Sequence, residues 1–255
     1  NNLILISLDQ EKAFDRVNRN FLFKIMAHLN FGPSFIQWIR TLYAGANCRI
    51  INNGWLSEPI SLDRGVRQGC PLSPLLYTLV IESLACAIRQ NPRIEGIPIP
   101  GMQVRSKIIA YADDGTLTLK NDTSVTAAFD QITEFEKASG SKLNMQKTEG
   151  IYIGQQAGRD HGPVPIKWKT DSIQILGTNI GNNATQDWEK ATTKTEKTLE
   201  KWSERQLTLK GKMTILQTYA IATIVYLASM FFIPDTYITR IHRACFKFLW
   251  SGKNE

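Results

Sequence analysis

Hydrophobic and polar positions along this chain follow two periods, one typical of strands and one typical of helices. Leu3–Leu8 is a nearly continuous apolar run, which predicts a strand buried on both faces, and Asp9 closes it. Residues 107–119 hold two β-prone runs separated by Asp113, Asp114 and Gly115. An Asp-Gly pair between such runs predicts a hairpin, because glycine accepts a positive φ without steric cost. We therefore expect one carboxylate at the end of a buried strand and others at the tip of a hairpin.

Between these two stretches the apolar spacing is mostly helical. A helix is predicted over residues 21–29 behind an Asn20 cap, and a second helix follows the break at residues 32–34. The stripe of the second helix is expected to be core: Phe35, Ile36, Ile39, Leu42 and Tyr43. Residues 48–62 predict a hairpin that turns at Asn53 and Gly54, with Trp55 and Ile60 as packing residues or lying along a nucleic acid.

A glycine-bearing basic loop occupies residues 64–74 and runs into a helix with Ser73 as the predicted N-cap and Pro74 at the first position. Exposed amides, arginines and a helix N-terminus together suit an anion or a nucleotide, although a plain connecting loop has the same composition. The helix is predicted to point these residues inward: Leu75, Leu76, Leu79, Val80, Leu84 and Ile88.

The later part of the chain predicts a helix that is capped by Thr123 or Ser124 and stops at Gly140, then a polar loop over residues 141–149 and a strand to Ile153. Residues 154–165 contain three glycines and two prolines without hydrophobic periodicity, which predicts a linker. A strand pair ending at residues 175–178 follows. After Asn183 the pattern is helical, with a lysine-rich segment, an apolar segment and an amphipathic segment.

Composition changes this picture only modestly. The chain has 255 residues, 43% of them hydrophobic, so it can bury a sizeable core in one or two domains. The formal net charge is +7, and residues 151–255 hold 14 Lys and Arg against nine Asp and Glu. That excess suits a polyanionic partner, although a solvated lysine-rich face has the same composition.

Cellular location is predicted from cysteines and apolar runs. The sequence has four widely separated cysteines, which predict reduced thiols in an intracellular protein: Cys48, Cys70, Cys86 and Cys245. We expect the protein in the nucleus and cytoplasm. The apolar run at residues 220–233 is shorter than a membrane span and is expected to be a buried helix. The chain starts with Asn and leads directly into a core strand, so we expect it to be a piece of a longer protein.

The aspartates are the main candidates for chemistry. Adjacent carboxylates repel each other, and burying them costs several kcal/mol unless a cation compensates. A divalent metal would be that cation, although Asp-Asp-Gly is also an ordinary solvated turn. Asp9 and Asp113 lie far apart in sequence and could share a cation only if their strands are neighbours in one sheet.

Five sequence blocks in this order resemble the reverse transcriptase domain of non-LTR (LINE-type) retrotransposons. The blocks are residues 8–15 (Leu-Asp-Gln-Glu-Lys-Ala-Phe-Asp), 67–74 (Arg-Gln-Gly-Cys-Pro-Leu-Ser-Pro), 111–114 (Tyr-Ala-Asp-Asp), 142–149 and 176–177 (Leu-Gly). The resemblance covers essentially the whole chain. It implies an α+β right-hand polymerase fold. The palm, an antiparallel sheet backed by helices, would cover residues 1–181, with residual fingers elements around 20–65. A helical thumb would cover residues 182–255, and the fingers would be largely missing.

The resemblance also implies RNA-directed DNA synthesis, with an RNA template, a DNA primer and dNTPs as partners and two Mg²⁺ ions, or Mn²⁺, as cofactors. Two such ions stabilise the attacking and leaving oxygens of a phosphoryl displacement, and they prefer carboxylate oxygens. Asp9 and Asp113 are assigned as metal ligands and Asp114 as a secondary ligand. Asp15 and Asp122 are treated as ordinary polar residues.

The remaining roles follow from the same resemblance. Phe14 would exclude a ribose 2′-hydroxyl, or be a core aromatic, and Lys147 would neutralise or protonate pyrophosphate, or be a surface lysine. Leu176 and Gly177 resemble the primer grip, and the basic helices beyond residue 185 resemble the thumb that follows the duplex through its phosphates. The other substrate-binding candidates are Arg67, Gln68, Gly69 and Tyr111.

The chain also departs from the family pattern. It lacks most of the fingers, the endonuclease and the cysteine-rich C-terminal region expected of full elements, so alone it is expected to bind nucleotide poorly. Two alternatives stay open at this point: a catalytically silent nucleic-acid-binding remnant, and another right-hand polymerase such as a group II intron maturase. Phe14 argues against a viral RNA-dependent RNA polymerase, because an RNA maker must admit the 2′-hydroxyl.

Overall fold

The computed structural model describes residues 2–181 and 185–250. Its contacts divide the chain into two compact units, residues 1–173 and residues 174–255. The sequence-based boundary at 181/182 falls on the edge of residues 182–184, which lie outside the described residues. The two units are therefore described one at a time.

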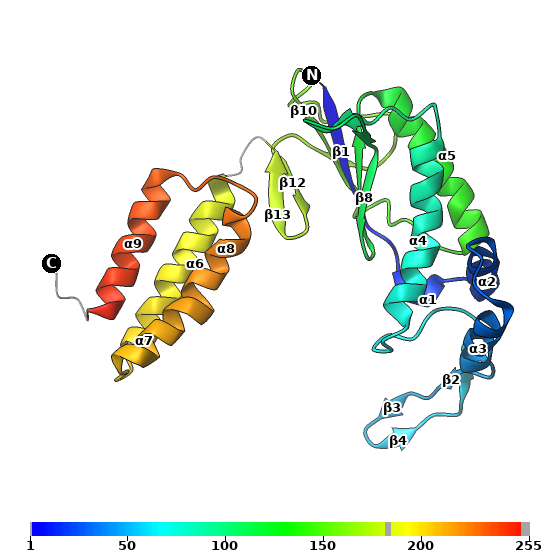
Figure 1. Cartoon of the computed structure of the whole chain (residues 1–255), viewed down its shortest axis with the longest axis horizontal. Helices are drawn as coiled ribbons and strands as arrows, with labels where there is room; N and C mark the ends of the chain where they lie inside the picture. Colours follow the sequence, from blue (N-terminus) through cyan, green and yellow to red (C-terminus); the bar gives the residue numbers. More distant parts are fainter. Residues whose placement is uncertain (1, 182–184, 251–255) are drawn as a thin grey trace. The chain divides into compact units, whose positions relative to one another are not determined.

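The first unit is built on a five-stranded sheet with the strand order β11-β10-β1-β9-β8 (Figure 1). β1 (Leu3–Leu8) lies at its centre and pairs antiparallel with β9 (Asp114–Leu119) and β10 (Glu149–Ile153). β8 (Ile108–Tyr111) pairs antiparallel with β9, and β11 (Lys167–Lys169) pairs parallel with β10. Leu3–Leu8 is thus the central strand of the sheet, as its continuous apolar run predicts.

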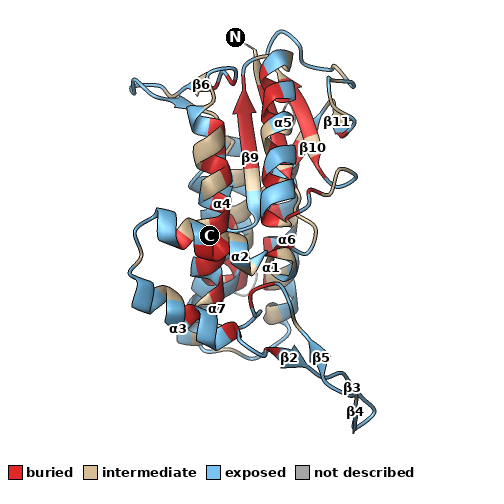
Figure 2. Cartoon of the chain, turned by 90° about the vertical axis from the view of Figure 1, so that its right-hand side faces the viewer, coloured by how far each residue is buried: buried red, intermediate tan, exposed pale blue. Residues whose placement is uncertain are grey.

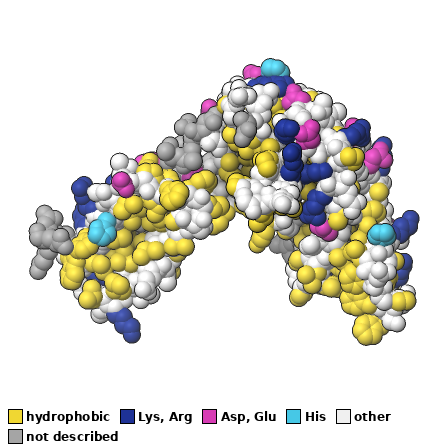
Figure 3. Space-filling model, turned by 45° about the horizontal axis from the view of Figure 1, so that its top comes forward, with side chains coloured by type: hydrophobic (Ala, Val, Ile, Leu, Met, Phe, Trp, Pro, Cys, Tyr) yellow, Lys and Arg dark blue, Asp and Glu magenta, His cyan; other side chains and the backbone are white. Residues whose placement is uncertain are grey.

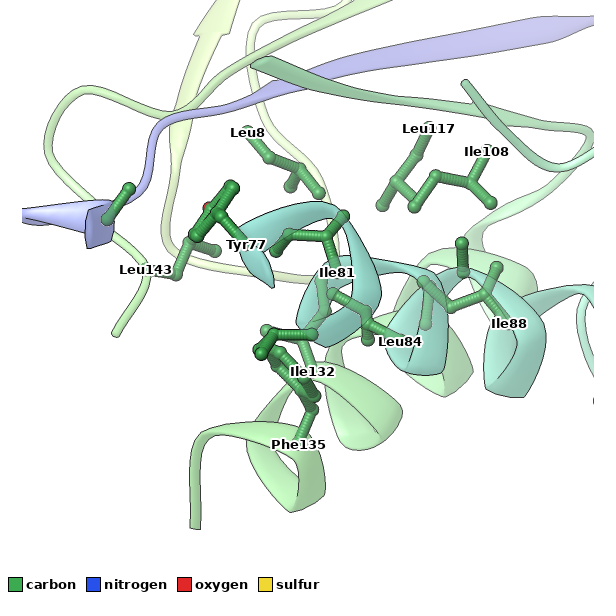
Figure 4. Close-up of a cluster of buried hydrophobic side chains, with 14 of the residues drawn as sticks. Leu8, Tyr77, Ile81, Leu84, Ile88, Ile108, Leu117, Ile132, Phe135 and Leu143 are labelled. Atoms are coloured by element: carbon green, nitrogen blue, oxygen red, sulfur yellow. The ribbon is translucent and has the colours of Figure 1, made fainter. Parts of the chain in front are cut away.

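Helices cover one face of this sheet and make the main core (Figure 2). Ile4, Ile6 and Leu8 of β1 alternate toward the helices and are buried with residues of α4 (Ser73–Gln90) and α5 (Asp122–Ser139). Figure 4 shows this cluster, with Leu8 and Leu117 on the strand side and Leu84, Ile132 and Phe135 on the helix side. On the other face Leu5 is also buried. The mixed helix and strand content predicted from the sequence is confirmed.

Short elements complete the first unit. The helices are α1 (Ala13–Arg16), α2 (Arg19–His28) and α3 (Pro33–Tyr43). The paired short strands are β2 (Asn47–Cys48) with β5 (Ile60–Ser61), β3 (Ile51–Asn52) with β4 (Trp55–Leu56), and β6 (Ile97–Pro98) with β7 (Arg105–Ser106). The predicted hairpin turn is confirmed: Asn53 and Gly54 have φ of 48° and 85°.

Three predicted helix caps are wrong by one to three residues. Asn18, rather than Asn20, caps α2 by accepting from the backbone N–H groups of Asn20 and Phe21. Asn121 caps α5 by accepting from the N–H of Ser124. Ser73 is the first residue of α4 and is buried against Tyr43, so its hydroxyl is used in packing rather than in capping. Gly140 ends α5 at φ 75°, as predicted.

Several predicted core residues are exposed. Trp55 is 81% exposed and Ile60 45%, because the β2–β5 region projects from the unit, as its colour shows in Figure 2. On α3 only Ile39 and Tyr43 are buried, whereas Phe35 and Leu42 are exposed. Leu75 is likewise exposed, at the first turn of α4. Helical spacing identifies an apolar stripe, but it does not say how much of that stripe another element covers.

Residues 154–165 are not a linker between the two units. Arg159 forms an ion pair with Asp122 at 2.9 Å, and its guanidinium stacks over the ring of Tyr152. Gly162 lies so close to Trp168 that an added Cβ would come within 2.3 Å of the indole ring. Arg159 and Gly162 therefore fasten this stretch to the first unit.

The boundary between the units falls within β12 (Ser172–Ile175), which pairs with β13 (Thr178–Gly181), and the second unit continues as helices. α7 (Leu209–Ile215), a π-helical turn η1 (Leu216–Ile221) and α8 (Ala222–Ala228) follow each other directly. α6 (Thr185–Ser203) packs against these helices and against α9 (Asp235–Leu249). Two small cores, around Leu199 and Phe248 and around Trp188 and Ile224, hold the helices together.

The apolar run at residues 220–233 is buried on one side only. Ala220, Ile224 and Leu227 are buried, whereas Val225 and Tyr226 are exposed, so the prediction of a buried helix is half right. Figure 3 shows hydrophobic side chains over the visible face of this helical unit. Within the described residues, no helix combines the length and the apolar character that crossing a bilayer requires.

Candidate functional site

The predicted aspartates lie at one end of the central sheet. Leu8, the last residue of β1, pairs with Gly115 of β9, so Asp9 continues directly beyond this pair. Tyr111 of β8 pairs with Asp114 of β9, which leaves Ala112 and Asp113 as the two-residue turn between these strands. Asp9 and the Asp113–Asp114 tip therefore belong to neighbouring strands. They lie along the same edge of the sheet, the edge formed by the ends of these strands.

The turn itself differs from the one expected from Asp-Gly. Its positive φ falls on Ala112, at 53°, and Gly115 is an ordinary strand residue. Gly115 is small for another reason, since an added Cβ would meet the Leu8 side chain at 3.3 Å. An alanine in the left-handed region costs about 1–2 kcal/mol, so the hairpin tip holds backbone strain.

The donor chemistry of this edge fits a hard divalent cation, because Asp9, Asp113 and Asp114 offer carboxylate oxygens. Asp113 and Asp114 are exposed and Asp9 is half-buried, so a ligand can reach all of them. In the described part of the chain, no three His, Cys, Asp or Glu side chains are grouped as a ready metal site. The backbone thus brings the carboxylates to one edge without gathering their side chains.

A loop from residues 141–149 is fastened beside Asp9. The carbonyl of Asp9 accepts from the N–H of Asn144 at 2.8 Å, and the N–H of Asp9 donates to the Thr148 hydroxyl at 3.3 Å. Glu11 N–H donates to the Lys142 carbonyl at 2.9 Å. Lys147 is exposed on this loop. The sequence blocks that carry Asp9 and Lys147 are therefore neighbours.

Phe14 lies against a residue that the sequence analysis did not single out. Its ring stacks on that of Tyr77 in α4, with the ring centroids 4.8 Å apart and the planes 14° from parallel. The Tyr77 hydroxyl donates to the side-chain carbonyl of Gln10 at 2.9 Å. Burial, and secondly the charge of Asp113, raise the pKa of Tyr77. Tyr77 thus contacts two residues of the first sequence block, Gln10 and Phe14.

The basic loop at residues 64–69 is held by Arg19. Its guanidinium donates to the carbonyls of Leu62, Arg64 and Gly65 at 2.7, 3.0 and 3.0 Å, and burial lowers the pKa of this arginine. Gly65, at φ 84°, is so close to the Asp15 carbonyl oxygen that an added Cβ would lie 2.8 Å from it. The hydrogen bonds of Arg19 and the close approach of Gly65 to Asp15 together hold the loop against the segment that carries Phe14.

The candidates on this loop have separate surroundings. The Gln68 amide donates to the Asp15 carboxylate at 3.5 Å, and the Arg67 guanidinium lies 5.9 Å from the centroid of the Tyr43 ring. Gly69 has φ 79° with open space around it. Across the sheet end, Tyr111 is 70% exposed. The loop is anchored at its base and leaves its side chains open to solvent.

Leu176 and Gly177 form the turn of the β12–β13 hairpin in the second unit. Both have positive φ, 47° and 82°, as a type I′ turn requires. The Tyr226 hydroxyl of α8 donates to the Leu176 carbonyl. This turn is therefore fixed to the helices of its own unit.

One face of α6 carries a row of exposed lysines, which we call the lysine stripe: Lys190, Lys194, Lys197 and Lys201. Their spacing places them opposite the buried side of α6, around Trp188 and Leu199. Glu189 and Glu196 turn instead toward Arg240 of α9, which binds them at 2.7 and 2.8 Å. No ion pair joins a stripe lysine to another described residue, so the stripe presents an uncompensated positive row to solvent.

Sequence reasoning missed Tyr77 and Arg19, although each had a signal. Tyr77 lies one helical turn beyond Ser73 on the inward side of α4, where a tyrosine needs a partner for its hydroxyl. Arg19 begins α2, where the helix dipole disfavours a cation, so its presence there indicates another role.

Comparison with known proteins agrees with this geometry. Residues 1–180 match the model of the family described as reverse transcriptase (RNA-dependent DNA polymerase). The chain therefore belongs to the reverse transcriptase family.

Curated relatives come from retrotransposons, which confirms the non-LTR resemblance. Over 264 residues the chain is 31% identical to the transposon TX1 149 kDa protein of Xenopus laevis, covering 99% of this chain and 20% of that protein. It is 28% identical over 155 residues to a Pol polyprotein of the retrotransposable element R2 of Popillia japonica, covering 60% of this chain and 21% of that protein. The chain thus spans about a fifth of the length of these relatives.

A solved structure shows the same fold at low identity. Telomerase from Candida tropicalis, in complex with a fragment of telomeric RNA, superposes with a TM-score of 0.53 at 13% identity, covering 97% of this chain and 43% of that chain. This likeness supports the mixed helix and strand architecture.

Proposed function

We propose that this chain is the catalytic domain of an RNA-directed DNA polymerase that extends a DNA primer on an RNA template. One observation supports this most strongly. In a member of the reverse transcriptase family, Asp9 follows the Leu8–Gly115 pair and so lies on the strand next to the Asp113–Asp114 turn. The relatives' retrotransposon origin and the RNA bound to the telomerase neighbour favour an RNA template.

In this proposal the first unit is the palm, with residual fingers elements around residues 20–65, and the helical part of the second unit is the thumb. Leu176 and Gly177 would form the primer grip, held by Tyr226. The lysine stripe would meet backbone phosphates, since unpaired surface lysines bind nucleic acid without regard to sequence.

Asp9 and Asp113 would hold two Mg²⁺ ions, with Asp114 in a secondary role. When bound, such ions lower the charge repulsion between the primer oxygen, the α-phosphate and the departing pyrophosphate. The reaction forms a bond between the primer 3′-oxygen and the α-phosphorus and breaks the bond to pyrophosphate. Lys147, held beside Asp9 by its loop, would supply a positive charge or a proton to the pyrophosphate.

The dNTP would be oriented by residues around this edge. Phe14 would exclude a ribose 2′-hydroxyl, and Gln68 and Gly69 would contact the incoming nucleotide, with Arg67 and Tyr111 at the border of the site. These roles fit the exposure of the loop at residues 67–69, whose base is fixed by Arg19. A fixed base with open side chains suits a site that must admit a new nucleotide in each cycle.

The test is primer extension on an RNA template with Mg²⁺, using the longest natural reading frame that contains these residues. Asp113→Asn removes a charge with little change of volume and should abolish dNTP incorporation. Asp130→Asn, the same change at an exposed position of α5, should leave incorporation unchanged. Salt-sensitive RNA binding without any incorporation by the unaltered protein would instead identify a silent nucleic-acid-binding remnant.

A further inference from the structure

Tyr77 lies beside Phe14, the residue proposed to exclude the ribose 2′-hydroxyl. It is completely buried, and it lies in the first turns of α4 near Leu8 and Leu143 (Figure 4). Its ring faces Phe14, and its hydroxyl reaches Gln10, the residue that follows Asp9. The stack and the hydrogen bond together join Tyr77 to two residues of the segment that follows Asp9.

The stack limits how Phe14 can move. α1, which carries Phe14, has only four residues, and its backbone is held to the basic loop by the Val66 N–H, which donates to the Phe14 carbonyl at 2.8 Å. The backbone is therefore fixed, and the remaining freedom of Phe14 is rotation of its side chain. Phe14 is half-buried, and the nearly parallel Tyr77 ring supports one of its faces. Removing that support would let the Phe14 ring turn or retreat.

The hydroxyl fixes Tyr77 in turn. Gln10 forms a bridge with Leu143 of the loop that carries Lys147, and it accepts the Tyr77 hydrogen bond at 2.9 Å. This bond joins the ring to the backbone beside Asp9. Two connections therefore join the Phe14 ring to the Asp9 region: the intervening chain, and the route through Tyr77 and Gln10.

We propose that Tyr77 is a positioning residue for sugar selection: it holds the Phe14 ring in the place from which that ring excludes a 2′-hydroxyl. This inference rests on the proposed polymerase function. Tyr77 does not touch the nucleotide in this proposal and acts only through Phe14.

The experiment compares incorporation of a dNTP and the matching rNTP as a ratio of kcat/KM values. Tyr77→Leu removes the flat face and should lower this ratio by about tenfold or more, since losing a steric contact of this size is worth that much discrimination. Tyr77→Phe keeps the stack and loses only the hydrogen bond to Gln10, so its ratio should lie between that of the unaltered protein and that of Tyr77→Leu. Phe135→Leu, a matched loss of a buried ring in α5, should destabilise the fold without changing the ratio.

An unchanged ratio in an active Tyr77→Leu variant would overturn the proposal, as would an equal fall in Phe135→Leu. Should Tyr77→Leu fail to fold, Tyr77→Met takes its place, because the flexible methionine side chain adapts to an irregular space without offering a flat face. Fluorine NMR of a fluorine-labelled phenylalanine at position 14 gives a readout that does not need activity. We expect one sharp resonance in the unaltered protein and a broadened or shifted resonance in the variant. An identical resonance in the two proteins would contradict the proposal. If the unaltered protein extends no primer at all, the proposed function itself fails.

Discussion

Gly65 offers a sharp test of how the basic loop is pressed against the segment that carries Phe14. Gly65→Ala faces two costs. The first is the left-handed φ of 84°, which costs an alanine about 1–2 kcal/mol. The second is contact with the Asp15 carbonyl oxygen, Cα and carbonyl carbon at 2.8, 3.0 and 3.1 Å, which are backbone atoms that cannot rotate away. Forcing extra atoms into such a space costs roughly 1–3 kcal/mol.

Gly69→Ala is the matched control, because Gly69 has nearly the same φ, 79°, and nothing within 4 Å of an added Cβ. Both changes reduce the entropy of the unfolded chain by about 0.4–1 kcal/mol, and this gain cancels in the comparison. We expect Gly69→Ala to lower the free energy of unfolding by about 1 kcal/mol or less and Gly65→Ala by about 2–4 kcal/mol.

Urea unfolding followed by circular dichroism measures both values. The extra cost of Gly65→Ala should be accompanied by a higher KM for dNTP, because the displaced loop carries Gln68. Equal losses of stability in the two variants, or a larger loss in Gly69→Ala, would refute the close approach of this loop to Asp15.

Other parts of the structure give further predictions. Ala112→Gly relieves the left-handed alanine at the hairpin tip and should raise the free energy of unfolding by up to about 1 kcal/mol in chemical denaturation; a decrease would contradict the strained turn. Arg19→Lys should cost at least about 2 kcal/mol in the same assay, because one ammonium group cannot reach the carbonyls that the guanidinium joins. Replacing lysines of the stripe by glutamine should reduce the slope of log Kd against log salt for RNA–DNA duplex by about one per lysine, whereas Lys137→Gln on α5 should leave the slope unchanged.

Periodicity and turn chemistry predicted much of the first unit from the sequence. The continuous run at Leu3–Leu8 becomes the central strand, and Asn53–Gly54 and Gly140 adopt the positive φ values that their residue types indicate. These features are local, so a short window of sequence contains the physical information that determines them.

Features that depend on distant partners were predicted less well. Asp114 and Gly115 suggested the wrong turn residues, because pairing with β8 and β1 places both inside β9, where Leu8 needs the space beside Gly115. Trp55 had the pattern of a packing residue and is exposed, since nothing in a sequence window shows how far an element projects. The Tyr77 stack on Phe14 joins residues that are far apart in the sequence, and it became visible only in the folded chain.

The central claim is that Asp9 and the Asp113–Asp114 turn share divalent cations. Iron-directed cleavage tests it most directly: Fe²⁺ replaces Mg²⁺, and peroxide with ascorbate cuts the backbone next to the bound ion. The account predicts cuts near residue 9 and near residues 111–115, both suppressed by excess Mg²⁺ and both lost in Asp9→Asn. Cuts at only one of these segments, or cuts at residues 111–115 that survive in Asp9→Asn, would contradict a shared site.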